Sequence, residues 1–248
     1  MLRCGITASE PEPATGSRMS GVSVLAAPAD ITVLLDMDGT LIDSHDAVVR
    51  CIHMTMEEMG HPADRTEDLG WTIGPPLTDT MALLLGRHGD DRVAEGVAVF
   101  QRHHDELVLA ESPLFPGIRE VLDRFGTEGR RLVLTTSKAL PAARMILERH
   151  GLMGLFAGTY GANADDTGGE KPEVIARAIA GEGIDPARAI MVGDRRYDIS
   201  GAHANKVRAL GVLWGYGGRE ELESAGADGL VDEPGQLAEA IDAMARAL

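Results

Sequence analysis

The chain has 248 residues, 44% of them hydrophobic but only 4% aromatic, and a formal net charge of −16 from 39 acidic and 23 basic side chains. A chain of this length can form one large domain or two unequal ones, with a sizeable core. The acidic balance argues against nucleic acid or an anionic membrane as a partner. No stretch approaches the roughly 18 apolar residues that a membrane span needs.

Residues 1–29 differ in composition from the rest of the chain. They include the stretch SEPEPATGS and lack the continuous apolar segment of a secretory signal. We interpret them as a flexible N-terminal extension, with Met19 as a candidate for the true start. The two cysteines, Cys4 and Cys51, are expected to be reduced thiols, which favours a cytoplasmic location.

Five short apolar runs in the remaining sequence predict strands. The first, ITVLLD over residues 31–36, is unbroken, as in a strand that is buried on both faces of a parallel sheet. The other predicted strands cover residues 131–137, 189–194, 207–215 and 228–232. Helical patterns between them cover residues 117–129, 140–151, 171–183 and 198–207. This alternation predicts an α/β fold, a doubly wound Rossmann-like parallel sheet whose ligand crevice lies beyond the carboxyl ends of the strands.

Residues 44–115 interrupt the alternation directly after the first strand. Three helical patterns fall there, over residues 46–60, 77–89 and 91–111, and no convincing strand. We predict that residues 30–43 and 116–248 form the catalytic core and that residues 44–115 form a helical cap above the crevice. Cap residues that face the crevice would select the substrate, with residues 71–79 as candidates.

Polar residues stand at the ends of three predicted strands. Asp36 and Asp38 follow the first strand in the motif DMDGT, and Thr136 and Asp194 end two others. The carboxyl ends of parallel strands share one edge of a sheet, so we expect these side chains to converge. Two acids buried side by side cost several kcal/mol without a cation, which indicates a positive charge at this edge.

The lysines of this chain are few. Lys138, Lys171 and Lys206 are the only ones among 23 basic residues, which favours a retained role for a compact ammonium. Lys171 opens a predicted helix, and we expect it at the crevice with little contribution to packing. Taken alone it would be an ordinary surface lysine, and Thr136 alone would be a turn or cap residue.

Taken in chain order, four motifs closely resemble the haloacid dehalogenase superfamily of phosphohydrolases. They are DMDGT, Thr136 followed by Ser137, Lys171 in GGEKPE, and GDRRYD from Gly193 to Asp198. The resemblance covers roughly residues 30–248. The stretches DGTLIDS, FPGIREVL and TTSK are most similar to the phosphoglycolate phosphatase-like branch with a small helical cap, which also contains nucleotidases and pyrophosphatases. Lys206 departs from this pattern, since glycine is frequent at that position.

The resemblance implies a phosphoric monoester hydrolase that acts on a small phosphorylated metabolite through an aspartyl phosphate. Asp36 would be the nucleophile. Asp38 would be the general acid and base, giving a proton to the leaving alcohol and taking one from the attacking water. Catalytic roles would also fall to Thr136 and Lys171.

The same resemblance implies a Mg²⁺ site and a phosphate site. Mg²⁺ would be held by the Asp36 carboxylate, the backbone carbonyl of Asp38 and the Asp194 carboxylate. Asp198 would act from nearby, either as a further ligand or as a hydrogen-bond acceptor that fixes the metal waters. The phosphate would be bound by the backbone N–H of Met37 and by three side chains: Thr136, Ser137 and Lys171.

Several alternatives stay open at this point. Within the branch the chain could be a 5′-nucleotidase or a pyrophosphatase. A phosphomutase would need cap cations for a second phosphate, and five arginines are candidates: Arg50, Arg65, Arg87, Arg92 and Arg102. A non-catalytic binder of a phosphoryl ligand is a further reading. The chain could be a monomer or a homodimer.

Overall fold

The computed structural model of the chain describes residue 1, residues 31–62 and residues 64–246. The interpretations of residues 2–29, of Met19 as a start and of Cys4 as a reduced thiol lie outside the described residues. Cys51 is a buried free thiol. No helix of the described residues has the length and apolar character that a membrane crossing requires.

The described residues contain one six-stranded sheet in the order β3-β2-β1-β4-β5-β6, with every neighbouring pair parallel. Strand β1 therefore lies between β2 and β4, and its Leu35 is in register with Leu134 on one side and Val192 on the other. The strands are Thr32–Leu35 (β1), Arg131–Ala139 (β2), Phe156–Ala162 (β3), Ala189–Gly193 (β4), Arg208–Val212 (β5) and Gly229–Val231 (β6). The predicted α/β fold with a doubly wound parallel sheet is confirmed.

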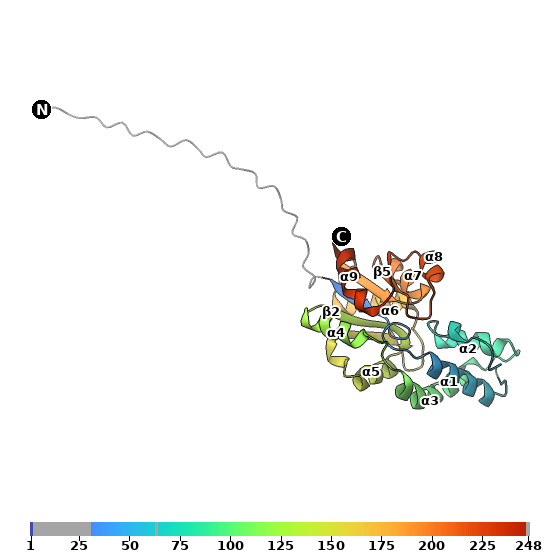
Figure 1. Cartoon of the computed structure of the whole chain (residues 1–248). Coiled ribbons are helices and arrows are strands. Elements are labelled where there is room, and N and C mark those ends of the chain that lie inside the picture. The colour runs from blue at the N-terminus through green and yellow to red at the C-terminus, as the bar shows by residue number, and fades with distance from the viewer. Residues whose placement is uncertain (2–30, 63, 247–248) are drawn as a thin grey trace.

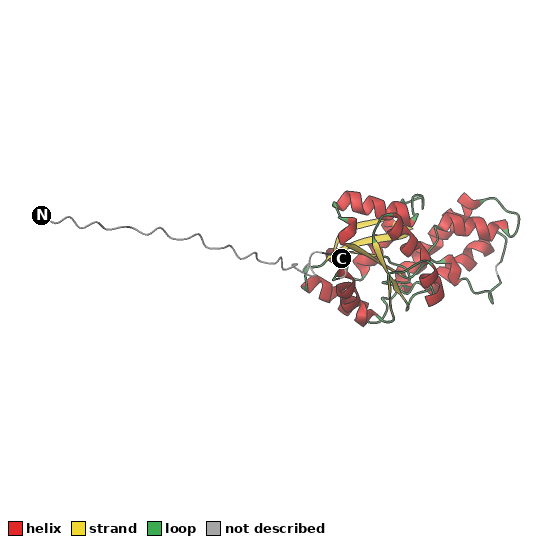
Figure 2. Ribbon diagram, turned by 90° about the horizontal axis from the view of Figure 1, so that it is seen from above, coloured by secondary structure: helices red, strands yellow, loops and turns green. Residues whose placement is uncertain are grey.

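Helices cover both faces of the sheet (Figures 1 and 2). One face is packed by Ile118–Thr127 (α4), Leu140–Arg149 (α5) and Leu237–Ala245 (α9). The other is packed by Lys171–Glu182 (α6), Arg196–Ala204 (α7) and Arg219–Ser224 (α8). Short 3-10 helices are Gly70–Thr72 (η2), Met153–Leu155 (η3), Pro186–Arg188 (η4) and Pro234–Gln236 (η5).

The apolar run of β1 explains why it lies at the centre of the sheet. Its side chains alternate between the faces, so that Val33 and Leu35 join the core under α4 and α5 while Leu34 joins the core under α6 and α7. All three side chains are buried. A strand that buries both faces in this way requires an unbroken apolar run, which is the pattern that predicted it.

Strand β3 was missed by the sequence analysis, as were helices α8 and α9. The β3 sequence FAGTYGA contains two glycines and two alanines, and most of its side chains are only partly buried at the edge of the sheet. A Cβ on Gly161 would lie 2.6 Å from the carbonyl oxygen of Lys138 on β2. The glycine that weakens the strand signal is therefore needed for close approach of the two strands.

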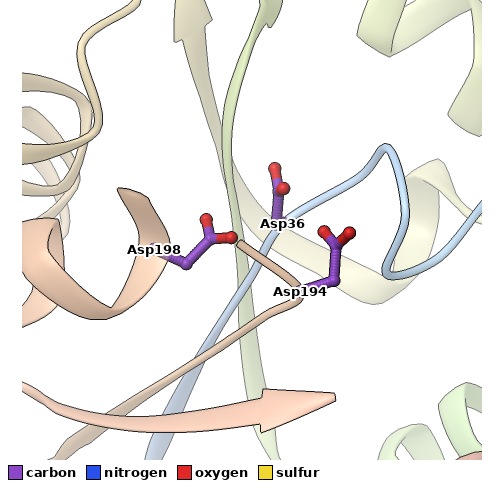
Figure 3. Close-up of side chains that lie close together, drawn as sticks. All are labelled: Asp36, Asp194 and Asp198. Carbon is purple, nitrogen blue, oxygen red and sulfur yellow. The ribbon is translucent and has the colours of Figure 1, made fainter. Parts of the chain in front are cut away.

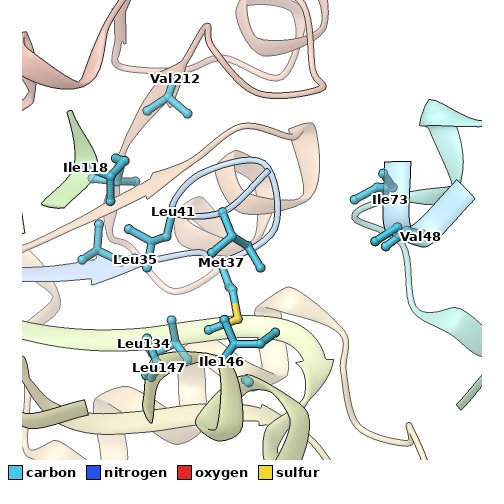
Figure 4. Close-up of a cluster of buried hydrophobic side chains, with 14 of the residues drawn as sticks. Leu35, Met37, Leu41, Val48, Ile73, Ile118, Leu134, Ile146, Leu147 and Val212 are labelled. Carbon is cyan, nitrogen blue, oxygen red and sulfur yellow. The ribbon is translucent and has the colours of Figure 1, made fainter. Parts of the chain in front are cut away.

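The chain between β1 and α4 forms a helical insert that lies to one side of the sheet (Figure 1). Its helices are His45–Glu58 (α1), Leu77–Gly86 (α2) and Val93–Glu111 (α3). The two connections to the sheet run side by side, because the Asp43 N–H donates to the Pro113 carbonyl at 2.9 Å and Ile42 forms an antiparallel bridge with Leu114. Figure 4 shows Val48 and Ile73 of the insert set apart from sheet residues such as Leu35.

Candidate active site

Three buried aspartates meet at the carboxyl ends of β1 and β4 (Figure 3). Asp36 follows β1, Asp194 follows β4, and Asp198 lies in the first turn of α7. One carboxylate oxygen of each lies within 4.8 Å of those of the other two. Because β1 and β4 are neighbours in the sheet, their ends place these side chains together as the sequence analysis expected. Such a set of hard oxygen donors fits Mg²⁺ or another hard divalent cation.

Asp194 is held by backbone that approaches it closely. The Tyr216 N–H donates to one of its oxygens at 2.7 Å, and the Thr40 hydroxyl donates to the other at 3.4 Å. A Cβ on Gly39 would lie 2.2 Å from Asp194 Oδ2, and a Cβ on Gly215 would lie 2.3 Å from its Cβ. Gly39 also has a φ of +82°, which other residues rarely adopt. Gly39, the glycine of DMDGT, is thus required both because a side chain would collide with Asp194 and because its φ is positive.

Lys171 lies between two of the three carboxylates. Its Nζ is 2.5 Å from Asp36 Oδ1 and 2.7 Å from Asp198 Oδ1, and it donates to the Thr135 carbonyl at 2.9 Å. The side chain is only 2% exposed. The expectation that Lys171 contributes little to packing was wrong, because the ammonium is enclosed by groups that it neutralises. Removing one partner of a buried ion pair leaves an uncompensated charge.

The three carboxylates carry more negative charge than one ammonium neutralises. Burial raises the pKa of Asp36 to about 7, although Lys171 opposes this shift. Burial, followed by the charges of Asp198 and Asp36, raises the pKa of Asp194 well above its usual value. The pKa of Lys171 is raised by Asp198 and Asp36 even though burial opposes the rise. A divalent cation would remove this deficit.

Asp38 has different partners from Asp36, two residues away. Burial would raise its pKa, but the charge of Lys138 and hydrogen bonds from Ser44 and Lys138 hold it below the usual value. The Lys138 Nζ lies 3.0 and 3.1 Å from the two carboxylate oxygens, and the Ser44 hydroxyl donates at 2.5 Å. The sequence analysis assigned no role to Lys138. Its rarity and its place directly after Ser137 were the available signal.

A cavity of about 300 Å³ lies between the sheet edge and the insert. Its lining includes Asp36, Asp38 and, from the end of β2, Thr136 and Ser137. The structure thus brings these four predicted residues to one space. Met37, which was also predicted, is fully buried, with its side chain in the apolar core (Figure 4), and its backbone hydrogen-bonds to the Asp36 carboxylate. The other predicted residues, Lys171, Asp194 and Asp198, are not among the residues that line the cavity.

The insert forms the other wall of this cavity. Phe100, Gln101 and His104 of α3 line it, and the Gln101 side chain donates to the Ala164 carbonyl after β3 at 3.3 Å. Burial, with a smaller effect of the nearby Lys138 charge, lowers the pKa of His104 to about 3. His104 is therefore a neutral imidazole at physiological pH.

Comparison with known proteins agrees with this geometry. The family model of the haloacid dehalogenase-like hydrolases matches residues 33–212. The chain belongs to the haloacid dehalogenase-like hydrolase family. The resemblance in the four sequence motifs is thereby confirmed.

Several curated proteins are similar to the chain along most of its length. Tyrosine-protein kinase PtkA of Mycobacterium tuberculosis is 32% identical over 186 residues, which cover 75% of this chain and 62% of PtkA. The chain thus spans less than two thirds of that relative. A 5′-nucleotidase of Pseudomonas aeruginosa is 31% identical over 77% of this chain and 86% of its own. Pyrophosphatase PpaX of Bacillus velezensis is 29% identical over 83% of this chain and 93% of its own.

Solved structures show the same fold. A predicted phosphatase from Clostridium acetobutylicum superimposes with a TM-score of 0.80 at 29% identity, over 85% of this chain and 97% of that one. The structure of Mycobacterium tuberculosis PtkA gives a TM-score of 0.73 at 30% identity, over 86% of this chain and 98% of that one. The names phosphatase, 5′-nucleotidase and pyrophosphatase among these proteins support the predicted class of enzyme, a phosphoric monoester hydrolase.

The charge deficit of the aspartate cluster gives a prediction for Asp194→Asn. A carboxyl group whose pKa is raised on folding destabilises the folded state at every pH above its unfolded pKa of about 4, and increasingly so as the pH rises. Without metal, Asp194→Asn should therefore exceed the wild type in free energy of unfolding by about 1 kcal/mol or more near pH 8, and the difference should shrink toward pH 4.

Urea denaturation in EDTA and in Mg²⁺ measures this effect. Mg²⁺ at about 100 times its Kd should raise the free energy of unfolding of the wild type by about 2.7 kcal/mol and that of Asp194→Asn far less. Asp123→Asn, an exposed change on α4, should behave as the wild type. An equal gain from Mg²⁺ in Asp194→Asn would show that the cluster is no metal site.

Proposed function

We propose that the chain is a Mg²⁺-dependent phosphatase that hydrolyses a small phosphorylated metabolite through an aspartyl-phosphate intermediate. The observation that supports this most is the environment of Asp36. Its carboxylate touches Lys171 at 2.5 Å, belongs to the aspartate cluster and lines the same cavity as Asp38. Asp36 thus belongs both to the aspartate cluster and to the cavity that the second acid lines.

Asp36, Asp194 and Asp198 would hold the metal, with the backbone carbonyl of Asp38 as a fourth ligand. When bound, the ion supplies positive charge that offsets the repulsion between the carboxylates and the phosphate. Asp198 has a second task, because one of its oxygens accepts from the Arg195 N–H at 3.0 Å while the other contacts Lys171. It therefore orients Lys171 toward Asp36.

The first step joins an Asp36 carboxylate oxygen to the phosphorus. The bond from phosphorus to the leaving oxygen breaks, and Asp38 gives its proton to that oxygen. In the second step Asp38 takes a proton from a water whose oxygen bonds to the phosphorus. The bond between Asp36 and phosphorus then breaks, which returns the carboxylate and releases phosphate.

The phosphate oxygens would be held by donors at the ends of β1 and β2. The proposed donors are the hydroxyls of Thr136 and Ser137, the Met37 N–H and the Lys171 ammonium. In the present structure Lys138 pairs with Asp38, which keeps that carboxylate ionised. Lys138 must release Asp38 before the latter can donate a proton, and the bound phosphate offers Lys138 another anion.

A phosphomutase is disfavoured by the positions of the arginines in the insert. None of the five lines the described cavity, and each pairs with a nearby carboxylate: Arg50 with Glu111, Arg65 with Glu57, Arg87 with Glu67, Arg92 with Asp90 and Arg102 with Glu58. A second phosphate would find none of these cations in the cavity. A 5′-nucleotidase of the same branch stays the second candidate, supported by the relative of that name.

We also propose that residues 44–115 act as a cap that opens for substrate and closes for chemistry. They line the cavity together with the sheet edge and join it through two adjacent connections. The polar contacts that close it include Gln101 to the Ala164 carbonyl and Arg195 of the core to the Ile73 carbonyl. Its motion would admit substrate and then exclude water.

Locking the insert tests this motion. Cysteines at positions 101 and 164, joined by a short thiol-reactive linker in a Cys4→Ser background, should lower turnover at least about tenfold, because product release needs opening. Reductant should restore it if the linker is a disulfide. Each single cysteine variant, treated alike, is the control. Unchanged turnover in the quantitatively linked protein would refute the opening motion.

The two aspartates of DMDGT should respond differently to amide substitution. Asp38→Asn keeps the backbone carbonyl and loses proton transfer, so hydrolysis of an alkyl phosphate should fall about 10²- to 10⁴-fold. The loss should be smaller for p-nitrophenyl phosphate, whose phenolate departs unprotonated. Rapid-quench kinetics should then show a burst of p-nitrophenolate followed by slow turnover.

Asp36→Asn is the matched comparison, and it should abolish hydrolysis of both substrates. Equal losses for the alkyl and aryl substrates in Asp38→Asn, without a burst, would exclude Asp38 as the acid and base.

A further inference from the structure

The wall of the cavity beyond the predicted phosphate site is mainly apolar. The insert contributes Val48, Ile52, Ile73, Leu77 and Phe100. Helix α5 and the residue before it contribute a second apolar group from the core side: Ala139, Pro141, Ala142 and Met145. A leaving group in this space is surrounded by hydrocarbon from both sides.

The charges that line the cavity are unfavourable for an anion. Lys138 is the one lysine or arginine among the described lining residues. Its ammonium contacts both oxygens of Asp38 and, in the proposed reaction, turns to the transferred phosphate. His104 is neutral at physiological pH. Asp166 adds a further carboxylate, and its Oδ2 is buried without a hydrogen-bond partner among the described residues.

The position of Asp166 is unusual for an acid. The residue is 7% exposed and has a φ of +66°, in the loop between β3 and α6. Asn and Asp adopt such a backbone more readily than other side chains apart from glycine. The loop also contacts the insert, because Gln101 donates to the carbonyl of Ala164. The fold thus places an acid with one unsatisfied carboxylate oxygen in the wall of the space that a leaving group would enter.

We propose that the leaving group of the substrate is an uncharged alcohol with a largely apolar body, such as a phenol, and that Asp166 rejects leaving groups with a second anionic centre. This inference rests on the proposed phosphatase function and narrows its substrate class. It disfavours 2-phosphoglycolate, pyrophosphate and sugar bisphosphates. An anion in this space would face Asp166, and like charges at close range repel each other.

A matched pair of substrates tests the proposal. Phenyl phosphate and 4-carboxyphenyl phosphate differ by one carboxylate at the far end of the leaving group. For the wild type with Mg²⁺ near pH 8, kcat/KM for phenyl phosphate should exceed that for 4-carboxyphenyl phosphate at least about 100-fold. A nucleoside 5′-monophosphate should likewise be preferred over 2-phosphoglycolate and pyrophosphate.

Variants of residues in or near the cavity wall distinguish an effect of the Asp166 charge from an effect of any change in this region. Asp166→Asn should raise the ratio of kcat/KM for 4-carboxyphenyl over phenyl phosphate at least about tenfold. Asp165→Asn, an exposed neighbour in the same loop, should leave the ratio unchanged. Gln101→Arg, which adds a cation to the wall while the Asp166 carboxylate is retained, should raise the ratio as well.

The outcomes distinguish this inference from the function on which it rests. If none of these phosphates is hydrolysed with Mg²⁺, the proposed function fails and the inference with it. If phenyl phosphate is hydrolysed but 4-carboxyphenyl phosphate or 2-phosphoglycolate is hydrolysed equally well or better, the function stands and the inference is refuted. A ratio that moves equally in Asp165→Asn and Asp166→Asn would remove the role of Asp166.

Discussion

The architecture of the site depends on one buried ammonium among carboxylates. Lys171 contacts Asp36 and Asp198 at 2.5 and 2.7 Å, and with Asp194 these acids form a cluster that a single positive charge does not neutralise. Buried charges of one sign are costly unless they are paired or bind a cation. The fold maintains this unfavourable arrangement at the carboxyl edge of the sheet, which is typical of a functional site.

The topology of the sheet explains why the side chains of the site lie close together. Strand β1 lies between β2 and β4, so the residues that follow the three strands share one edge. The unbroken apolar runs of the strands fix the sheet between two layers of helices, and the short loops at their ends then have little freedom. Gly39 and Gly215 leave room for Asp194 there. Rigid strands therefore position the acids, and the helical insert supplies one wall of the cavity beside them.

The sequence predicts most of this fold because its signals are local. Apolar runs mark the central strands, and periodic patterns mark most of the helices around them. Strand β3 escaped because an edge strand that contains Gly158 and Gly161 has no such run. The position of Asp36 and Asp194 follows from adjacent strand ends, whereas the contact of Lys138 with Asp38 and the burial of Lys171 and Asp166 depend on side-chain packing that no motif encodes.

In the proposed reaction the Asp36 carboxylate, held by Lys171, forms a bond to phosphorus. Acid quenching of the Mg²⁺-loaded protein during turnover of a phosphorus-32 substrate measures this most directly, with the labelled peptide identified by mass spectrometry. We expect base-labile phosphorus-32 on Asp36, which forms and decays at least as fast as the enzyme turns over. Full turnover without labelled protein, or label and turnover that persist in Asp36→Asn, would contradict it.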